Sequence, residues 1–162
     1  MSNASTTQVF LGLGSNLNPE ANIPLGIERL RQRYSVLQQS PSYRSPAMGF
    51  NGPDFINLVL LIECEQSLPE LIQELKKLEE EFGRSPDAVK FSSRYLDIDV
   101  LLYGDLSGEH GGIQLPRSDV RRCAYVLRPL LDIYPDARDP VSGALLSSWW
   151  PALAAQPLQR LE

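Results

Sequence analysis

The sequence has few of the residues that build redox, metal and covalent catalytic centres. It contains two cysteines, Cys64 and Cys123, and one histidine, His110, among 162 residues. This set is too small for a zinc site with cysteine and histidine ligands, and no Cys–His or Ser–His–carboxylate arrangement is credible for nucleophilic catalysis. Each cysteine stands among apolar residues, which predicts two reduced, largely buried thiols and a cytoplasmic protein.

Long apolar runs and an excess of basic residues are also missing. No apolar stretch approaches the roughly 18 residues of a membrane helix, so no membrane span is expected. The formal net charge is −5, from 15 Lys and Arg against 20 Asp and Glu, which argues against a nucleic-acid partner or an anionic membrane surface. An acidic protein can still bind a polyphosphate through a few local cations.

The length fits one domain spanning residues 1–162. A chain of this size can bury roughly 70% of its unfolded surface, so it needs no disulfide or metal to fold. Residues 1–7 are small and polar, without the basic and apolar regions of a signal peptide. We expect them to be a disordered tag or tail outside the fold.

The order of the expected elements is β-α-β-β-α-β. Apolar runs predict strands at 9–13, 35–45, 55–65 and 95–103, and helical spacing predicts helices at 19–33 and 68–82. Asn18 is expected to cap the first helix, and Ser67 and Glu70 form a capping box before the second. Residues 84–93 and 104–112 are expected to be loops, 122–131 a short helix, and the tail from Tyr134 irregular. This order favours an α+β sandwich of the ferredoxin-like type, with C-terminal additions.

Two carboxylates stand two residues apart in the strand expected at 95–103. Because strand side chains alternate, Asp97 and Asp99 point to one face, with their backbones about 7 Å apart. Such a pair can hold one or two Mg²⁺ ions, with phosphate oxygens completing the coordination. A pair of solvent-facing aspartates is the alternative.

Basic residues precede this strand. Arg84 and Arg94 bracket the expected loop, and Lys90 lies between them. Arginines beside a two-carboxylate metal site suit a nucleotide triphosphate. Solvated surface arginines, or arginines paired directly with the aspartates, fit the spacing equally well.

Two further patterns lie in the first and third expected strands. Gly12 and Gly14 resemble the start of a dinucleotide-binding loop, but the third glycine of that pattern falls at Leu17, so a tight turn explains them better. Phe55 and Asn57 share a strand face, where a ring and an amide can stack on a flat heterocycle and bind its edge. The alternative is a core phenylalanine beside an edge asparagine.

Four segments, in this order, resemble the 6-hydroxymethyl-7,8-dihydropterin pyrophosphokinases of folate biosynthesis. The segments are 11–17, 43–46, 53–57 and 94–104, of which the last is the most specific. The resemblance covers about residues 9–140. It implies a transferase that moves pyrophosphate from ATP to the hydroxymethyl group of the pterin and releases AMP.

The resemblance also implies roles for individual residues. The catalytic set would be Arg84, Arg94, Asp97 and Asp99, with both aspartates binding two Mg²⁺ ions. The ATP contacts would be Glu79, Lys90, Phe91, Ile98 and Arg117. The pterin contacts would be Ser45, Pro46, Met48, Phe55, Asn57 and Tyr125, with Phe55 and Tyr125 on opposite sides of the ring.

The sequence departs from the family pattern mainly in the ATP site. Arg117 stands where the family has histidine, and Cys123 stands where it has arginine, for which Arg121 or Arg122 is a candidate replacement. These departures motivate a second hypothesis, a catalytically weakened paralogue that binds pterin or nucleotide without efficient transfer. A ferredoxin-like interaction domain without a small-molecule site is a third. A monomer is expected in each case.

Overall fold

Six strands form one antiparallel sheet in the computed structural model, which describes residues 5–83 and 95–161. The sheet strands are β1 (Thr7–Ser15), β2 (Ser35–Gln39), β3 (Ser42–Ser45), β4 (Phe55–Cys64), β5 (Asp97–Tyr103) and β8 (Gln159–Leu161). Their order is β5-β1-β4-β3-β8, with β2 also paired to β4, and every pairing is antiparallel. This is the arrangement expected of a ferredoxin-like βαββαβ unit, with β2 and β3 together forming its second strand.

The second strand is interrupted at Ser40 and Pro41. The backbone N–H of Ser40 donates to the carbonyl of Val59 at 2.9 Å, and the N–H of Val59 donates to Ser40 Oγ at 2.9 Å. Pro41 has no N–H to continue the ladder. Residues 35–45 were predicted as one strand, and the structure divides them into β2 and β3 while both stay paired to β4.

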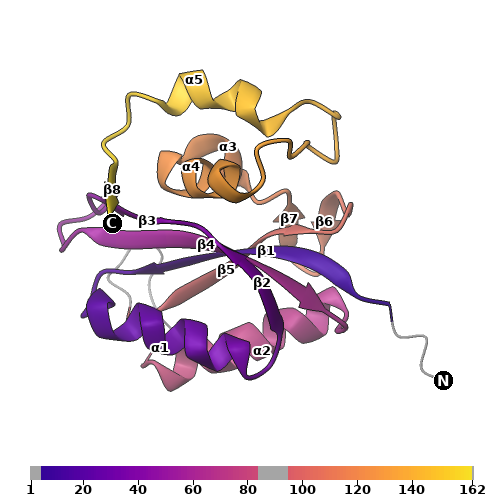
Figure 1. The fold of residues 1–162 in the computed structure, drawn as a ribbon, viewed down its shortest axis with the longest axis horizontal. Coiled ribbons are helices and arrows are strands. Elements are labelled where there is room, and N and C mark those ends of the chain that lie inside the picture. The colour runs from indigo at the N-terminus through magenta and orange to yellow at the C-terminus, as the bar shows by residue number, and fades with distance from the viewer. Residues whose placement is uncertain (1–4, 84–94, 162) are drawn as a thin grey trace.

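Two long helices, α1 (Pro19–Arg31) and α2 (Leu68–Glu81), cover one face of the sheet (Figure 1). The predicted capping box of α2 is confirmed, because Ser67 Oγ accepts from Glu70 N–H and the Glu70 carboxylate accepts from Ser67 N–H. The predicted position of the α1 cap is confirmed, but the side chain of the cap residue does not take part. Asn18 stands at the N-cap in a left-handed conformation, with φ of 50°, and its side chain makes no capping bond.

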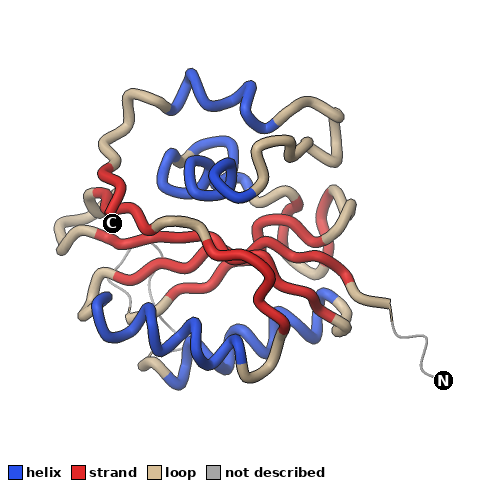
Figure 2. Tube along the Cα trace, viewed as in Figure 1, coloured by secondary structure: helices blue, strands red, loops and turns tan. Residues whose placement is uncertain are grey.

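The C-terminal additions form a second helical layer on the opposite face, so helices lie on both sides of the strands (Figure 2). This layer contains α3 (Ser118–Arg122), α4 (Ala124–Ile133), a 3₁₀ turn η1 (Leu146–Trp149) and α5 (Trp150–Leu153). Cys123 divides the single helix predicted at 122–131. The tail predicted as irregular forms η1 and α5, which pack on α4, and ends as β8, paired with β3.

Each face of the sheet has its own core. Leu11, Leu13 and Leu60 point toward α1 and α2, whereas Phe10 and Leu61 belong to the cluster under α4. Cys64 is buried and Cys123 is half-buried, and both are free thiols, as predicted. This division matters for the site, because its residues extend from the second face around the outer edge of β5.

A short hairpin occupies the region after β5. Strands β6 (Gly108–His110) and β7 (Ile113–Leu115) pair with each other, joined by Gly111 and Gly112. Both glycines have positive φ, 60° and 90°, which is the backbone of a two-residue hairpin turn. The sequence predicted a loop at 104–112, and the hairpin is too short to produce a periodic signal.

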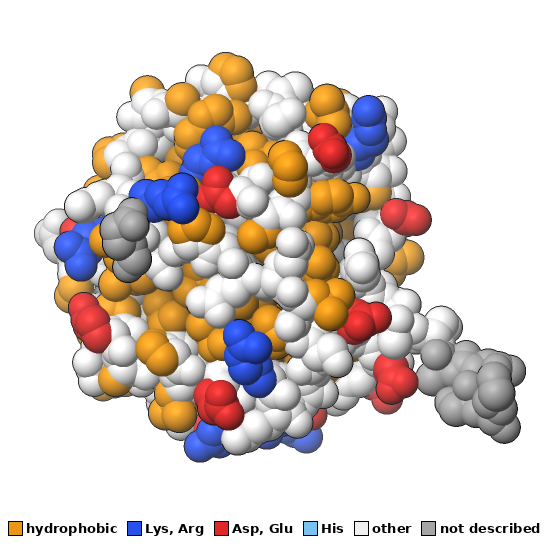
Figure 3. Space-filling view, viewed as in Figure 1, with side chains coloured by type: hydrophobic (Ala, Val, Ile, Leu, Met, Phe, Trp, Pro, Cys, Tyr) orange, Lys and Arg blue, Asp and Glu red, His pale blue; other side chains and the backbone are white. Residues whose placement is uncertain are grey.

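No helix in the described ranges is long and apolar enough to cross a bilayer. On the face shown in Figure 3, acidic and basic side chains are scattered among apolar and neutral ones. That face therefore presents no continuous basic surface.

Candidate functional site

Two glycines of the central strand β1 add no side chains to one end of the second sheet face, which we call the open end. Gly14 pairs with Asn57 of β4 on one side and Asp97 of β5 on the other, and Gly12 pairs with Asp99. A Cβ atom on Gly14 would lie only 2.4 Å from Asn57 Oδ1. The predicted tight turn is therefore wrong. Gly14 lies inside a strand, and its lack of a side chain gives the Asn57 amide its space.

Asp97 and Asp99 flank this open end, as the alternation of β5 predicted. Directly opposed residues of an antiparallel pair share a face, so each carboxylate lies beside one glycine of β1. Both aspartates are half-buried, whereas the intervening Ile98 is buried. In the described part of the chain, no group of three or more His, Cys, Asp and Glu side chains is placed to hold a metal. Two accessible carboxylates fit Mg²⁺, which keeps several waters and takes further ligands from substrate phosphates.

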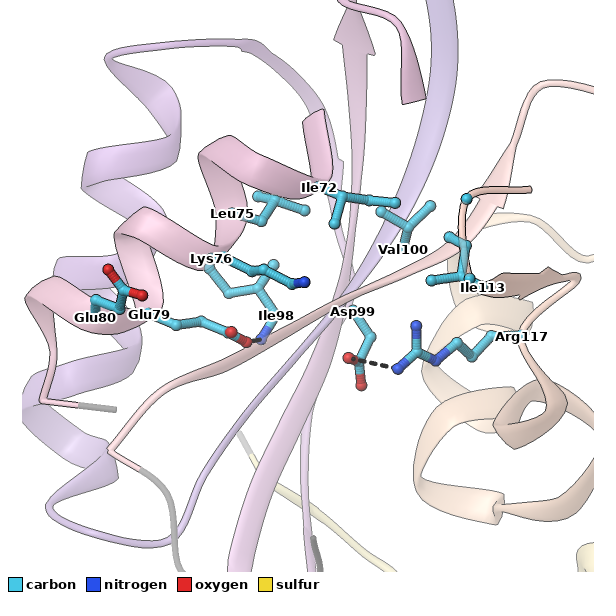
Figure 4. Close-up of a pocket in the computed structure, with 12 residues that line it drawn as sticks. Ile72, Leu75, Lys76, Glu79, Glu80, Ile98, Asp99, Val100, Ile113 and Arg117 are labelled. Carbon is cyan, nitrogen blue, oxygen red and sulfur yellow. Dashed lines mark hydrogen bonds and ion pairs between the residues drawn. The ribbon is translucent and has the colours of Figure 1, made fainter. Parts of the chain in front are cut away.

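Arg117 lies against this acid pair. Its Nη2 is 3.2 Å from Asp99 Oδ1, and its backbone N–H donates to the carbonyl of Leu101 at 3.0 Å (Figure 4). The residue precedes α3, so the backbone contact fixes the start of that helix against β5. The structure therefore places the predicted ATP contact Arg117 beside a predicted metal ligand.

Arg121 does not take the place of the family arginine at Cys123. Its guanidinium carbon lies 4.9 Å from the ring centre of Trp149, so the charge faces the C-terminal segment. Arg128 makes the same kind of contact with Trp150. Of the two candidate replacements, Arg121 is thus engaged elsewhere.

A cavity of about 570 Å³ lies between α2, β5 and the β6–β7 hairpin. Figure 4 shows the side chains around it, with apolar groups of α2, β5 and β7 at one end and Asp99 with Arg117 at the other. The predicted ATP contacts Glu79, Ile98 and Arg117 all line it. Lys76 and Ile113 line it too and were missed. Lys76 stands one helical turn before Glu79, so helical spacing offered a signal for it.

Glu79 connects α2 to the outer edge of β5. It is 6% exposed, and its Oε2 accepts the backbone N–H of Ile98 at 2.7 Å. The peptide that it holds lies between the two aspartates. Glu79 therefore holds the backbone of the acid pair from the cavity side of the strand.

A second group of predicted residues lies across Gly14 from the acid pair. Ser45 pairs with Phe55, and Asn57 lies two residues further along β4 on the same face. Within the described ranges, Ser45 Oγ and Asn57 Nδ2 are buried side-chain atoms without a hydrogen-bond partner. Leaving such a group unpaired costs about 1–3 kcal/mol, so a polar ligand that pairs with these atoms would recover that cost.

The segment after β3 covers this group from the side. Asn16 Nδ2 donates to the carbonyl of Pro53 at 3.1 Å, and the ring of Phe50 meets Phe55 edge-on, with centres 6.3 Å apart. Met48 and Pro46 are exposed. The resemblance named Met48 and Pro46 but not Phe50, which is the aromatic neighbour that the structure gives Phe55.

Tyr125 lies on the α4 side of the open end. Burial raises the pKa of its hydroxyl. The pKa rises further because the hydroxyl is hydrogen-bonded to Cys123 and lies near Asp119 and Asp99. Burial likewise raises the pKa of the Cys123 thiol. Tyr125 and Cys123 are thus neutral near neutral pH, and Tyr125 is within electrostatic reach of the acid pair.

Four predicted site residues lie outside the described ranges. They are Arg84, Lys90, Phe91 and Arg94. Their roles stay predictions.

Comparisons with known proteins match the chain to one family. Residues 10–135 match the family model of 7,8-dihydro-6-hydroxymethylpterin-pyrophosphokinase. A 2-amino-4-hydroxy-6-hydroxymethyldihydropteridine pyrophosphokinase from Synechocystis is 36% identical over 143 residues, covering 82% of this chain and 69% of the relative. The Aquifex aeolicus protein of the same name is 32% identical over 151 residues, covering 92% and 94%.

Solved structures agree at the level of the fold. The wild-type HPPK-DHPS protein of Plasmodium falciparum matches with a TM-score of 0.70 at 11% sequence identity, covering 94% of this chain. This chain spans 45% of that longer protein. The family model matches most of the sequence, and the Aquifex relative aligns nearly end to end. The chain belongs to the 7,8-dihydro-6-hydroxymethylpterin-pyrophosphokinase family.

Proposed function

We propose that this chain is a Mg²⁺-dependent pyrophosphokinase of folate biosynthesis. Its substrates are ATP and 6-hydroxymethyl-7,8-dihydropterin, and its products are AMP and the pterin diphosphate. The observation that carries the proposal is the geometry around Gly14, where a pair of carboxylates lies across the strand from the buried Asn57, whose Nδ2 has no hydrogen-bond partner. The carboxylate side suits Mg²⁺ and the phosphates of ATP, and the Asn57 side suits the edge of a heterocycle.

The pterin side is Ser45, Asn57, Phe55 and Tyr125, with Pro46 and Met48 at its margin. A pterin edge carries both hydrogen-bond donors and acceptors, which the unpaired Ser45 Oγ and Asn57 Nδ2 require. The flat ring suits the faces of aromatic side chains. This recognition supports a reduced pterin over an aliphatic alcohol as the acceptor.

The ATP side is the cavity of about 570 Å³ beside β5. Its apolar residues Ile72, Val100 and Ile113 suit a base, while Lys76 and Arg117 bring positive charge to the end where the phosphates would lie. By family resemblance we add Arg84, Lys90 and Arg94 as phosphate contacts and Phe91 as an aromatic ATP contact.

The reaction that follows needs positioning and charge neutralisation, not a covalent catalyst. The hydroxymethyl oxygen attacks the β-phosphorus of ATP, the bond from that phosphorus to the oxygen bridging the α-phosphorus breaks, and AMP leaves. Asp97 and Asp99 would hold two Mg²⁺ ions, which when bound offset the phosphate charge. Asn57 and Ser45 orient the pterin, Glu79 holds the β5 backbone between the aspartates, and Arg117 contacts phosphate.

A monomeric enzyme is part of the proposal, because helices cover both faces of the sheet. Its soluble substrates and its free thiols support a cytoplasmic location. Size-exclusion chromatography with light scattering tests the monomer. A dimer that persists on dilution would contradict it.

A weakened paralogue is the second candidate. Arg117 is already paired with Asp99, Cys123 brings no charge, and Arg121 packs on Trp149. Fewer described cations are thus left for a triphosphate than the family pattern provides. This candidate expects pterin binding without efficient AMP release.

One experiment separates the two candidates. AMP release from ATP and Mg²⁺ is measured with and without the pterin. The proteins compared are the wild type, Asp97→Asn and the control Asp105→Asn. The control changes an exposed aspartate after β5. Pterin-dependent AMP in the wild type and the control, and its loss in Asp97→Asn, support the pyrophosphokinase. Pterin binding without AMP favours the weakened paralogue. An active Asp97→Asn variant would contradict the proposed role of the acid pair.

A further inference from the structure

Cys123 is a non-helical residue between two helices. Its φ of −122° and ψ of 119° separate α3 from α4, so the chain turns sharply at this point. The peptide groups on either side, the carbonyl of Arg122 and the N–H of Ala124, both face the C-terminal segment. Tyr125, which is a predicted pterin contact, comes directly after Ala124 in α4.

One side chain binds both of these peptide groups. Gln156 Oε1 accepts the N–H of Ala124 at 2.8 Å, and Gln156 Nε2 donates to the carbonyl of Arg122 at 2.9 Å. The backbone N–H of Gln156 itself donates to Leu153 at the end of α5. The carboxamide thus completes the hydrogen bonding of the Cys123 junction from a segment more than thirty residues away in the sequence.

The same segment also reaches the opposite wall of the pterin site. After Gln156 the chain continues into β8, which pairs with Ser42, Tyr43 and Arg44 of β3. Ser45, with its unpaired hydroxyl, is the next residue of β3. Figure 1 shows the C-terminal segment running past α4 to the outer strand β3.

We propose that Gln156 is a positioning residue for pterin binding, which acts by fixing the Cys123 junction and so the place of Tyr125. The inference rests on the proposed function for the role of Tyr125. Gln156 contacts neither substrate. It determines where α4 begins relative to the open end of the sheet.

The effect is expected to be selective for the pterin. The start of α3 is held independently, because Arg117 N–H donates to the carbonyl of Leu101 and Val120 is fully buried. The cavity on the nucleotide side is formed by α2, β5 and the β6–β7 hairpin, which Gln156 does not touch. Loss of the two hydrogen bonds therefore displaces Tyr125 more than Arg117.

The test compares Gln156→Met with the matched control Gln159→Met. Methionine keeps the length of the side chain but makes neither hydrogen bond, and Gln159 is an exposed residue of β8. For each folded variant, the dissociation constants of pterin and of ATP are measured, together with the rate at which a thiol reagent labels Cys123. Peptide mass spectrometry separates that label from the buried Cys64.

We expect Gln156→Met to raise the dissociation constant of the pterin about three- to tenfold, because two hydrogen bonds are lost. The dissociation constant of ATP should rise less than about twofold. Labelling of Cys123 accelerates in the same variant. Gln159→Met leaves all three values at wild-type levels. A Gln156→Glu variant, which keeps the acceptor for Ala124 N–H, falls between the wild type and Gln156→Met.

The inference is overturned if Gln156→Met binds pterin as the wild type does, or if pterin and ATP weaken equally. A wild type that binds no pterin would instead refute the proposed function. In that case the labelling rate of Cys123 still tests whether Gln156 fixes the Cys123 junction. If Gln156→Met labels at the wild-type rate, Gln156 does not fix the junction.

Discussion

Arg117 Nη2 lies 3.2 Å from Asp99 Oδ1, and the two side chains are 33% and 27% exposed. The guanidinium therefore offsets the charge of one carboxylate of the acid pair before any nucleotide arrives. A half-exposed ion pair of this kind is worth up to about 1 kcal/mol. A divalent cation at Asp99 competes with it, whereas a nucleotide that brings its own phosphates gives Arg117 a new partner.

Replacing Arg117 is expected to change metal and nucleotide binding in opposite directions. Arg117→Gln should strengthen Mn²⁺ binding to the nucleotide-free protein about two- to fivefold, because the competing ion pair is gone. ATP binding should weaken. Titration calorimetry measures both, with Arg128→Gln as the control, since Arg128 pairs with Asp132 on α4. Weaker Mn²⁺ binding in Arg117→Gln would contradict this interpretation.

Removing the Glu79 carboxylate is expected to destabilise the protein. Glu79→Ala leaves the N–H of Ile98 without its buried acceptor, which costs about 1–3 kcal/mol in the free energy of unfolding. Glu79→Gln keeps an acceptor and should lose less. Urea denaturation measures the change, and Glu80→Ala, at an exposed position, is the control. Equal stability of Glu79→Ala and Glu80→Ala would show that the bond contributes nothing.

A methyl group on Gly14 should close the pterin side of the site. The new Cβ would lie 2.4 Å from Asn57 Oδ1, so the amide must move and cannot keep its orientation. We expect Gly14→Ala to lose pterin binding at least tenfold and to cost about 1–3 kcal/mol of stability, as overpacking does. Fluorescence titration with the pterin measures the affinity.

Gly12→Ala is the matched control in the same strand and on the same face. Its Cβ would meet only the side chain of Leu101, at 3.3 Å, which can shift slightly. Pterin affinity close to wild type is expected for this variant. If both alanine variants lose the pterin alike, the steric role of Gly14 beside Asn57 is wrong.

The pairing of Tyr43 with Asp132 predicts an alkaline loss of stability. Burial raises the pKa of Tyr43 to about 12, and its hydrogen bond to Asp132 contributes to the rise. The folded state therefore holds the proton more tightly than the unfolded state, whose tyrosine titrates near 10. Stability from this group is complete below about pH 10 and is lost between about pH 10 and pH 12.

Tyr43→Phe should be less stable than the wild type by about 1–3 kcal/mol below pH 10, because the bond to the carboxylate is gone. The difference should shrink as the pH rises toward 12. Urea denaturation across this range measures it, with the exposed Tyr134→Phe as the control. A difference that stays constant with pH would contradict the raised pKa.

The first helical layer and most of the sheet could be predicted from the sequence because their signals are long. The stripe of α2 repeats over about four turns, and β4 is mostly apolar. The second layer is built from elements of four to ten residues, such as α3, η1 and α5. Their conformation depends on tertiary contacts, since so few residues carry no periodic pattern.

The site likewise contains some features that the sequence could predict and others that it could not. Strand alternation was enough to place Asp97 beside Asp99 and Phe55 beside Asn57. The role of Gly14 could not be found, because a glycine in sequence favours a turn and only the register of β1 on β4 brings it against Asn57. Gln156 gave no local signal at all, since its partners lie more than thirty residues away.

The chain has two tryptophans, and both belong to the segment that packs on α3 and α4. Each indole lies under an arginine of the second layer, Trp149 under Arg121 and Trp150 under Arg128. The intrinsic emission of the protein therefore reports on the docking of its C-terminal segment, not on the sheet core. An emission change caused by pterin would reveal in real time whether filling the site tightens this layer, with no added fluorophore.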